Sequence, residues 1–444
     1  MKYHCLLFIL SLLFTSSYSK SNSEFDPYQK VTRYIVRNGK SMKVGIISDS
    51  QLLPEEGSTN FNYTEHLKTS LEVMKSHDVD AIIMAGDVGD AGTEYAFQIW
   101  HDVYEMVYPG NTKPILNIMM GNHDYWSPKP EESIVMQERF ARVVGEKPFS
   151  HKVINGFHFI NWGSEDASVT TCNSNIEWAK AQIDLAIKED PKKPIFVTTH
   201  VPPSGTMYGS TQWGNANTTK FLQDYPQVVS FSGHSHFALT DERSIWQGTF
   251  TAINTQAVAY IELETGKENG SIPKDENGDD AYARRNYMGI IMTVTNERVE
   301  LQRISLESNK FYKDPWIIDI PVQISTFRYN TEKRIAESVA PKFEGENEIK
   351  IIKKTIGEST FNQITFKQAT HNDLVQSYRI EFDNGTKVTK LLYFSDFFLM
   401  KEERGDNIIL KLPTLKKTKY TVSIYAIESF GKESEPITGE IEIS

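Results

Sequence analysis

Five short clusters of side chains that commonly bind metal ions lie in the first half or so of this chain. They combine carboxylate and amide oxygens with imidazole nitrogens, which suit Mn, Fe, Zn or similar ions better than Ca or Cu(I). In order, they are Asp49-Ser50-Gln51, Gly86-Asp87-Val88-Gly89-Asp90, Gly121-Asn122-His123-Asp124, Thr199-His200 and Gly233-His234-Ser235-His236. If these clusters meet in space, they can form a metal centre.

Apolar runs that predict buried strands precede the clusters. Four of the clusters follow Val44–Ile47, Ala81–Met84, Ile115–Met119 and Ile195–Val197, and the fifth follows Val228–Phe231. In an open α/β sheet, groups just beyond the carboxyl ends of parallel strands converge on one crevice. We therefore expect the five clusters to lie together.

This ordered set resembles the calcineurin-like metallophosphoesterase superfamily, whose pattern is Asp-x-His, Gly-Asp-x-x-Asp, Gly-Asn-His-Asp or Glu, His, and Gly-His-x-His. The resemblance covers roughly residues 43–320 and rests on the order and strand placement of all five blocks. It implies an α/β fold of two stacked β-sheets flanked by helices, with the site along one rim.

The resemblance also implies a centre of two divalent metal ions. Its ligands would be Asp87 as the bridge, with Asp49, Gln51 and His236 on one ion and Asn122, His200 and His234 on the other. Two ions roughly 3.5 to 4 Å apart can clamp a phosphate and acidify a shared water. The implied reaction is hydrolysis of a phosphoester by direct attack of a metal-bridging hydroxide, without a covalent intermediate.

Gln51 departs from the family pattern, which has histidine at this position. A neutral amide oxygen is a poorer donor than imidazole for first-row transition metals. Three outcomes follow: Gln51 ligates directly, it holds a ligating water, or the first ion is only partly occupied. We expect a bound pair of ions with altered affinity.

His123 is the residue expected to assist the reaction without binding an ion. In the family, the equivalent histidine faces the phosphate and the departing oxygen, where an imidazolium can act as general acid or stabilise charge. The resemblance implies that Asp124 keeps His123 protonated and aligned. We expect Asp90 to brace the ligands by hydrogen bonding; it stands where purple acid phosphatases have a metal-binding tyrosine, so a purple centre is not expected.

Other residues near the clusters could shape the site. Gly86, Gly121 and Gly233 are expected to let the backbone turn tightly beside the ions. The predicted substrate pocket comprises Tyr125, Trp126, Tyr208 and Trp213, which could stack on the leaving group. Arg284 and Arg285 could meet a second phosphate or an acidic group, although such pairs in polar loops are usually solvated.

Helices and further strands are predicted around the clusters. Apolar periodicity predicts helices at Thr64–Ser76, Thr93–Val107, Glu131–Val144 and Asn175–Glu189. Strands are predicted at Ser244–Ile253, Ala257–Leu263, Tyr287–Thr295 and Val299–Ser305. The polar segment Glu264–Arg285 is expected to be a long surface loop.

The C-terminal part is predicted to be a separate all-β sandwich domain. It resembles a fibronectin type III domain, with Tyr420 at the tyrosine corner that pins a turn through its hydroxyl. Such a domain could serve as a spacer or bind a protein or glycan partner. The predicted organisation is signal peptide 1–19, N-terminal extension 20–42, metallophosphoesterase domain 43–320, linker 321–340 and fibronectin type III-like β-sandwich 341–444.

Composition and the first residues restrict partners and location. The net charge of -11 and the absence of a long basic tract disfavour a nucleic-acid partner. Lys2, the apolar run Cys5–Phe14 and Ser17-Tyr18-Ser19 predict a cleaved signal peptide, hence a secreted or exported protein with no stable membrane insertion. Four glycosylation sequons begin at Asn62, Asn217, Asn269 and Asn384.

The resulting hypothesis is a secreted binuclear metallophosphoesterase acting on a small phosphorylated substrate, either a phosphomonoester or a nucleotide-like compound. One alternative is a phosphodiesterase with the same mechanism, because the ligands do not determine the pocket walls. Another is a non-catalytic secreted interaction protein on a degenerate phosphoesterase scaffold, which the replacement at Gln51 would favour.

Overall fold

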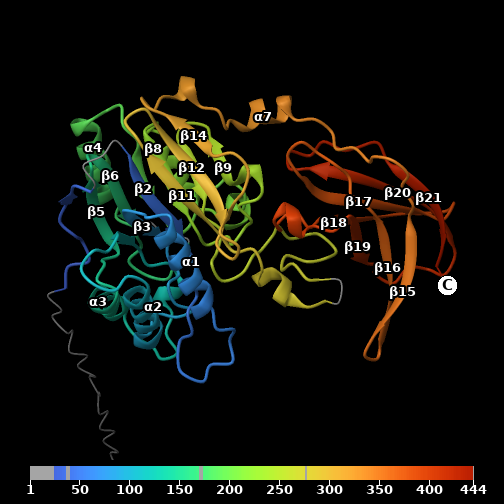
Figure 1. Ribbon diagram of the computed structural model, residues 1–444, viewed down its shortest axis with the longest axis horizontal. Coiled ribbons are helices and arrows are strands. Elements are labelled where there is room, and N and C mark those ends of the chain that lie inside the picture. The colour runs from blue at the N-terminus through green and yellow to red at the C-terminus, as the bar shows by residue number, and fades with distance from the viewer. Residues whose placement is uncertain (1–24, 37–40, 170–173, 276–277, 444) are drawn as a thin grey trace, which may run out of the picture.

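The computed structural model describes residues 25–36, 41–169, 174–275 and 278–443. Figure 1 shows an α/β domain in blue to yellow beside a β domain in orange to red, with the segment that contains helix α7 (Thr331–Glu337) between them. None of the helices in these ranges has the length and apolar content that a bilayer-spanning helix needs. The predicted signal peptide lies outside the described residues, so export stays a prediction.

Two stacked sheets form the centre of the α/β domain. The first has the order β1 (Thr32–Tyr34), β5 (Phe149–Ile154), β6 (Phe157–Trp162), β7 (Ile195–Thr198), β8 (Val228–Ser232), β10 (Thr251–Asn254) and β9 (Ile245–Gln247). The second has the order β13 (Lys310–Phe311), β12 (Arg298–Ser305), β11 (Met288–Val294), β2 (Met42–Ile47), β3 (Ala81–Met84) and β4 (Ile115–Ile118), and β14 (Trp316–Asp319) also pairs with β12. Strands β2, β3 and β4 are mutually parallel, as are β6, β7, β8 and β10. The predicted α/β fold with two stacked sheets is confirmed.

Helices cover the outer face of each sheet. The second sheet packs against α1 (Thr64–Ser76), α2 (Glu94–Val107) and α3 (Ser133–Val143). The first sheet packs against α4 (Ile176–Glu189) and α6 (Ala216–Leu222), and the short α5 (Ser210–Trp213) precedes α6. All four predicted helices are present to within two residues at each end.

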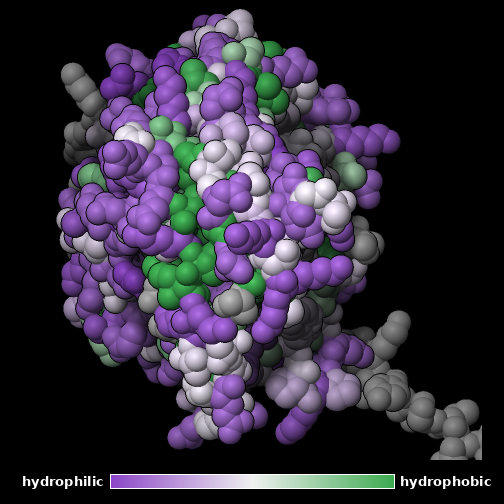
Figure 2. Space-filling model, turned by 90° about the vertical axis from the view of Figure 1, so that its right-hand side faces the viewer, coloured by the Kyte–Doolittle hydropathy of each residue, from purple (hydrophilic) through white to green (hydrophobic). Residues whose placement is uncertain are grey.

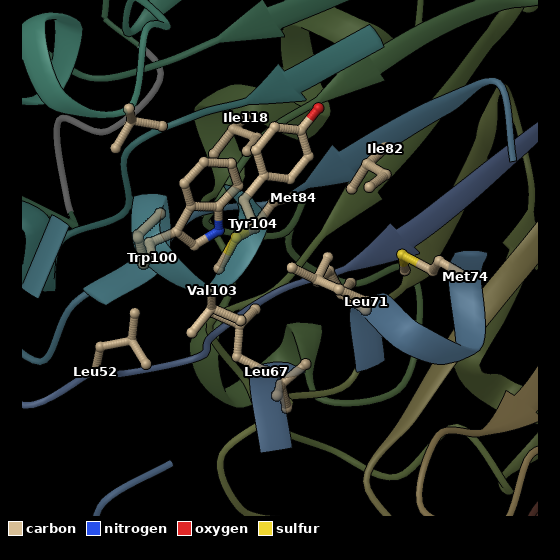
Figure 3. Close-up of a cluster of buried hydrophobic side chains, with 14 of the residues drawn as sticks. Leu52, Leu67, Leu71, Met74, Ile82, Met84, Trp100, Val103, Tyr104 and Ile118 are labelled. Atoms are coloured by element: carbon tan, nitrogen blue, oxygen red, sulfur yellow. The ribbon is translucent and has the colours of Figure 1, made fainter. Parts of the chain in front are cut away.

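The core beneath α1 and α2 explains why these segments are helical. Leu67, Leu71 and Met74 recur at helical spacing and lie on the buried face of α1, where they meet side chains of α2 and the second sheet (Figure 3). Trp100 stacks on Tyr104 with ring centroids 5.2 Å apart. Burying one such large apolar side chain stabilises the fold by about 1.5–3 kcal/mol.

Polar contacts link the two sheets at the edge formed by β4. The amide of Asn117 in β4 donates to the side-chain oxygen of Asn161 in β6 at 2.6 Å. The ammonium of Lys152 in β5 donates to the Leu116 carbonyl in β4 and to the Glu146 carboxylate. These contacts complement the apolar core between the sheets, to which β2, β3, β7 and β8 all contribute.

The C-terminal domain is a sandwich of two antiparallel sheets. One contains β15 (Lys350–Ile356), β16 (Ser359–Lys367) and β19 (Asn407–Lys411); the other contains β18 (Val388–Phe394), β17 (Val375–Asp383), β20 (Lys419–Glu428) and β21 (Ile437–Glu442). The Tyr420 hydroxyl donates to the Lys416 carbonyl at 3.0 Å, as predicted for a tyrosine corner. The fibronectin type III assignment itself stays a prediction.

The outer surface of the C-terminal domain contains apolar side chains among polar ones. Figure 2 views the molecule from this end and shows a hydrophobic strip bordered by hydrophilic residues. Large hydrophobic residues of this domain that are exposed include Ile352, Ile356, Val388 and Ile409. A partner for this domain nevertheless stays a prediction.

Two of the predicted strands are wrong. Ser244–Ile253 is not one strand, because β9 and β10 pair antiparallel across the turn between them. Ala257–Leu263 is buried but does not form a strand, because the backbone N–H groups of Val258 and Ala259 donate to Ser48 and Asp49 rather than to one neighbouring strand. Helix α7 lies in the segment predicted as the linker 321–340, and the domain boundary itself stays a prediction. The predicted long surface loop 264–285 packs against the C-terminal domain, where Figure 1 shows it in yellow.

The contact between the domains is both apolar and polar. The Asn269 side chain makes two hydrogen bonds with the backbone of Phe394, at 2.9 and 3.2 Å. Asn269 also begins one of the four sequons. An apolar interface cluster surrounds this contact and comprises Tyr208, Phe237, Ala238, Ile261, Leu263, Leu374, Phe394, Phe397, Phe398 and Leu399.

Replacing Glu146 by Ala is expected to lower the free energy of unfolding by about 3–5 kcal/mol, because it leaves the ammonium of Lys152 buried without its counter-charge. The two side chains are 9% and 2% exposed. Urea denaturation followed by tryptophan fluorescence measures the loss. As a control, Asp184→Ala removes an exposed ion pair with Lys180 and should cost less than about 1 kcal/mol. Equal losses in the two variants would contradict the inferred role of the buried pair.

Candidate metal centre

The two sheets bring the five predicted clusters to one place. Asp49, Asp87 and Asn122 follow β2, β3 and β4 of the second sheet. His200 follows β7 of the first sheet, and His234 and His236 follow β8. The donors from one sheet therefore face those from the other across the ends of the strands.

The backbone at these positions is unusual. Five of the twelve non-glycine residues with positive φ in the described ranges are predicted ligands: Asp49 (53°), Gln51 (42°), Asp87 (51°), His234 (67°) and His236 (56°). Each such conformation costs on the order of 1–3 kcal/mol and persists only where its surroundings enforce it. Their concentration at one site indicates that the local chain path is set by the placement of these side chains.

Three glycines allow segments of the centre to approach closely. A Cβ at Gly121 would lie 2.1 Å from Oδ1 of Asp87, and one at Gly233 would lie 2.2 Å from Oδ2 of Asp49. At Gly86, whose φ is +93°, a Cβ would lie 2.5 Å from Nδ1 of His200. The predicted need for glycine at these three turns is confirmed.

His200, Asp87 and Asn122 form one group of donors. Nε2 of His200 lies 3.2 Å from Oδ2 of Asp87 and 3.0 Å from Oδ1 of Asn122. Nδ1 of His200 lies 2.7 Å from the Ala85 carbonyl and donates to it in the neutral tautomer that has a free lone pair on Nε2. Two ligands of one ion are separated by about 2.9–3.4 Å when metal bonds are about 2.1 Å long, so this spacing fits shared coordination.

His236, Asp49 and Gln51 form a second group. Nε2 of His236 lies 3.4 Å from Oδ1 of Asp49 and 3.4 Å from the amide nitrogen of Gln51. Nδ1 of His236 contacts the Tyr260 carbonyl at 3.1 Å, so Nε2 can again point its lone pair inward. Gln51 thus lies beside the other donors of its group.

His234 and Asp87 connect the two groups. The His234 backbone N–H lies 3.2 Å from both carboxylate oxygens of Asp49. Its ring is 5.0 Å from that of His200. One donor atom from each of Asp87, His200 and His234 can be chosen so that all three lie within 4.8 Å of one another.

A comparison with known families finds the same family that the sequence motifs resemble. Residues 42–238 match the model of the calcineurin-like phosphoesterase family. The matched stretch contains all five clusters of predicted donors. A comparison with curated proteins found no match to this sequence.

Solved structures to which this chain is similar include three from different organisms. A purple acid phosphatase from yellow lupin seeds has 13% identity and a TM-score of 0.40, covering 63% of this chain and 54% of its own. For NAD nucleotidase of Haemophilus influenzae the values are 11%, 0.32, 63% and 50%. For a conserved Streptococcus pneumoniae protein described as a predicted phosphoesterase they are 10%, 0.27, 63% and 98%. The match thus spans about half the length of the lupin and Haemophilus proteins.

The donors of the candidate metal centre shift one another's pKa values. Burial favours a neutral Asp87, but the imidazole of His200 outweighs it and lowers the pKa of the carboxyl below its usual range. Burial likewise opposes charge on His200, yet Asp87 raises its pKa to about 9. Burial and the neighbouring His200 lower the pKa of His234 to about 3. Because a ligating imidazole must be neutral, a bound cation competes with the proton on His200.

His123 lies beside the donors and is partly open to solvent. Its backbone N–H donates to Oδ1 of Asp87 at 2.9 Å, and its side chain is 20% exposed. Nδ1 lies 3.2 Å from Oδ1 of Asp90. Burial opposes protonation, but the bond to Asp90 and the charge of Asp87 raise the pKa of His123 overall.

Asp124 does not orient His123 as predicted. Its carboxylate instead accepts backbone N–H groups from Val88 (3.1 Å), Gly89 (2.9 Å) and Gly121 (2.8 Å). Burial and the charge of Asp87 raise the pKa of Asp124 to about 7. Asp124 therefore ties together the loops after β3 and β4, while Asp90 takes the predicted role at His123.

Two of the four predicted pocket residues lie at the rim of the centre. Trp126 is 46% exposed with its ring 3.8 Å from that of His123, and Trp213 is 38% exposed with its ring 5.6 Å from that of His234. Tyr125 is buried in the core beneath α2 and α3. Tyr208 is buried in the interface cluster, where its hydroxyl donates to Glu264. Placing Tyr125 and Tyr208 in the pocket was therefore wrong.

Several residues of the site were missed. The carbonyls of Ala85 and Tyr260 fix the rings of His200 and His236. Ser48 donates its hydroxyl to Asp49, and Asn60 donates to Asp90 at 2.6 Å. Carbonyl groups give no sequence signal, because every residue has one. Ser48 could have been considered from its position directly before a predicted ligand.

Replacing Gln51 by His is expected to lower the dissociation constant of the ion that Asp49, Gln51 and His236 would hold by about tenfold. The reason is that imidazole is a better donor than an amide for first-row metals. Calorimetric titration with Mn²⁺ measures the change. The control Gln98→His places the same substitution on the exposed face of α2 and should leave affinity unchanged. If Gln51→His also has no effect, residue 51 does not contact a bound ion.

Proposed function

We propose that this protein is a metal-dependent phosphoester hydrolase with a two-ion centre. The observation that supports this most strongly is that the two groups of donors adjoin: the Gln51 N–H donates to the Asp87 carbonyl at 3.1 Å, and His234 bonds to Asp49 through its backbone while its ring can share an ion with Asp87 and His200. These donors come from both sheets and are largely buried. The family match of residues 42–238 supports the same class of reaction.

The residues present fit a pair of divalent ions. The proposed ligands are Asp49, Gln51 and His236 for one ion, Asn122, His200 and His234 for the other, and Asp87 for both. When bound, such ions would neutralise phosphate charge and acidify the attacking water. The pairing of carboxylate and amide oxygens with imidazole favours Mn, Fe or Zn.

His123 is proposed to assist departure of the leaving group. Asp90 holds its Nδ1, so Nε2 is the atom that can present a proton to a substrate at the rim. A protonated imidazole at this position can stabilise the developing alkoxide or protonate it. Asp124 has a different proposed task, because its three backbone hydrogen bonds keep Asp87 and Asn122 in place.

The proposed substrate is a small phosphomonoester or nucleotide-like compound. The exposed rings of Trp126 and Trp213 on the rim support a leaving group that can stack. A phosphodiester substrate would use the same ligands and is the alternative. A non-catalytic scaffold is disfavoured, because it has no need for buried charges and left-handed backbone at one rim.

Replacing His123 by Ala is expected to lower kcat for an aryl phosphate by about 10²–10⁴-fold while metal content stays at two ions per chain, because His123 acts on the leaving group rather than on the ions. Replacing Asp87 by Ala should remove both the activity and bound metal. Inductively coupled plasma mass spectrometry and a chromogenic aryl-phosphate assay give the two readouts.

The matched control for this pair is His77→Ala, whose side chain bonds to Asn309 away from the donors. It should keep both metal and turnover. Wild-type protein that binds two ions but hydrolyses no phosphoester, or full activity in His123→Ala, would refute the proposal in its stated form.

Asp90→Asn and Asp124→Asn are expected to differ in effect. Asp90→Asn should lower kcat about tenfold or more with little change in melting temperature, because it weakens the support of a protonated His123. Asp124→Asn should mainly lower the melting temperature and metal affinity, because it loosens the loops after β3 and β4. Steady-state kinetics and thermal denaturation compare them. A reversed pattern would restore Asp124 as the partner of His123.

A further inference from the structure

Loop 264–285 returns to the metal centre at its C-terminal end. The N–H of Ile261 donates to the Ala283 carbonyl at 2.9 Å. Tyr260, the residue before Ile261, accepts a hydrogen bond from Nδ1 of His236 at 3.1 Å. Arg284 follows Ala283 directly, so it stands on the same side of the centre as His236.

A series of aromatic ring contacts connects His236 with Arg284. The ring of Tyr260 lies 4.5 Å from that of His236 and 6.4 Å from that of Tyr63. Arg284 places its guanidinium 4.4 Å from the ring centre of Phe61, which is 4.9 Å from Tyr63. Burial raises the pKa of Tyr63, and a hydrogen bond with Arg284 opposes that shift. The guanidinium is therefore held in a defined position beside the rim.

Arg284 forms only a weak ion pair with Asp280, so its guanidinium can still bind a ligand. Its distance to Asp280 is 3.5 Å, and the two side chains are 24% and 55% exposed. An ion pair this long and this exposed contributes little. Because the whole chain has a net charge of -11, a local cation at the rim offsets the repulsion that an anionic substrate meets on approach.

The neighbouring Arg285 has a different task. It pairs with Glu403 of the C-terminal domain at 2.9 Å. The next residue, Asn286, donates to the Phe398 carbonyl at 2.7 Å. The Arg285 side chain is therefore engaged by the C-terminal domain, and the Asn286 bond anchors the end of the loop independently of it.

We propose that Arg284, held by Phe61 and Tyr63, is a specificity-determining residue that binds a second anionic group of the substrate, on the part that is not hydrolysed. The fork of the guanidinium suits a phosphate or carboxylate, which can accept two parallel hydrogen bonds. The inference rests on the proposed phosphoesterase function, since it assumes that the metal centre holds the first phosphate.

The test compares monophosphates of propanediol and hexanediol with the bisphosphates of the same diols, so that two spacings between anionic groups are sampled. The measured quantity is the ratio of kcat/KM for bisphosphate to that for monophosphate. In Arg284→Ala this ratio should fall at least about tenfold for one of the diols, because a charge-assisted hydrogen bond is lost. Arg284→Lys should retain part of the ratio, since it keeps the charge but not the fork.

Arg285→Ala is the matched control and should leave the ratio as in the wild type. An unchanged ratio in Arg284→Ala for both diols overturns the proposal. An equal fall in Arg285→Ala also overturns it, because the effect would then come from loop position rather than from recognition of an anion.

A binding measurement separates this proposal from the proposed function. If the wild type hydrolyses none of the four compounds, calorimetry in the presence of Mn²⁺ gives their dissociation constants. A tenfold weakening in Arg284→Ala confined to a bisphosphate supports the anion subsite even though hydrolysis has failed. Equal affinity of the wild type and Arg284→Ala for both bisphosphates overturns the subsite.

Discussion

The candidate metal centre depends on the alignment of the two stacked β-sheets relative to each other. Asp49, Asp87 and Asn122 belong to one sheet, and the imidazoles that face them belong to the other. A slip of one residue along a strand moves a side chain by about 3.3 Å. The donors are separated by 3.0–3.4 Å within each group, so such a slip would destroy the arrangement. The apolar core between the sheets and the polar link between Asn117 and Asn161 oppose it.

The centre itself opposes folding, and the rest of the domain offsets this. Buried charges lose hydration, and left-handed backbone at non-glycine residues is strained. Asp49, Asp87 and His236 are both buried and in the left-handed conformation, so both unfavourable contributions arise at them. Large cores on both faces of each sheet stabilise the domain around them. A cation bound between the donors would relieve much of their electrostatic conflict, which connects metal binding to stability.

The sequence allowed prediction of the helices, most of the strands and the meeting of the donor residues, because apolar periodicity and strand ends determine these features locally. Prediction from the sequence failed where contacts between residues remote in the chain determine the local structure. Asp124 is adjacent to His123 in sequence, yet Asp90 is the acid that reaches the imidazole. Tyr208 follows a ligand loop but is buried between the domains. Ala257–Leu263 has the composition of a strand, but its N–H groups bond to loops at the centre. In each case, the decisive partner is remote in the chain.

The contact between the two domains makes them poor candidates for independent modules. Phe237, Ile261 and Leu263 of the α/β domain are buried in one cluster with Phe397 and Phe398 of the sandwich. Cutting the chain between the domains would expose these side chains as an apolar patch that is prone to aggregation. The same boundary supports loop 264–285, whose end borders the centre. A substitution in the sandwich at this boundary would therefore shift the end of the loop at the rim of the candidate centre while every predicted ligand stays the same.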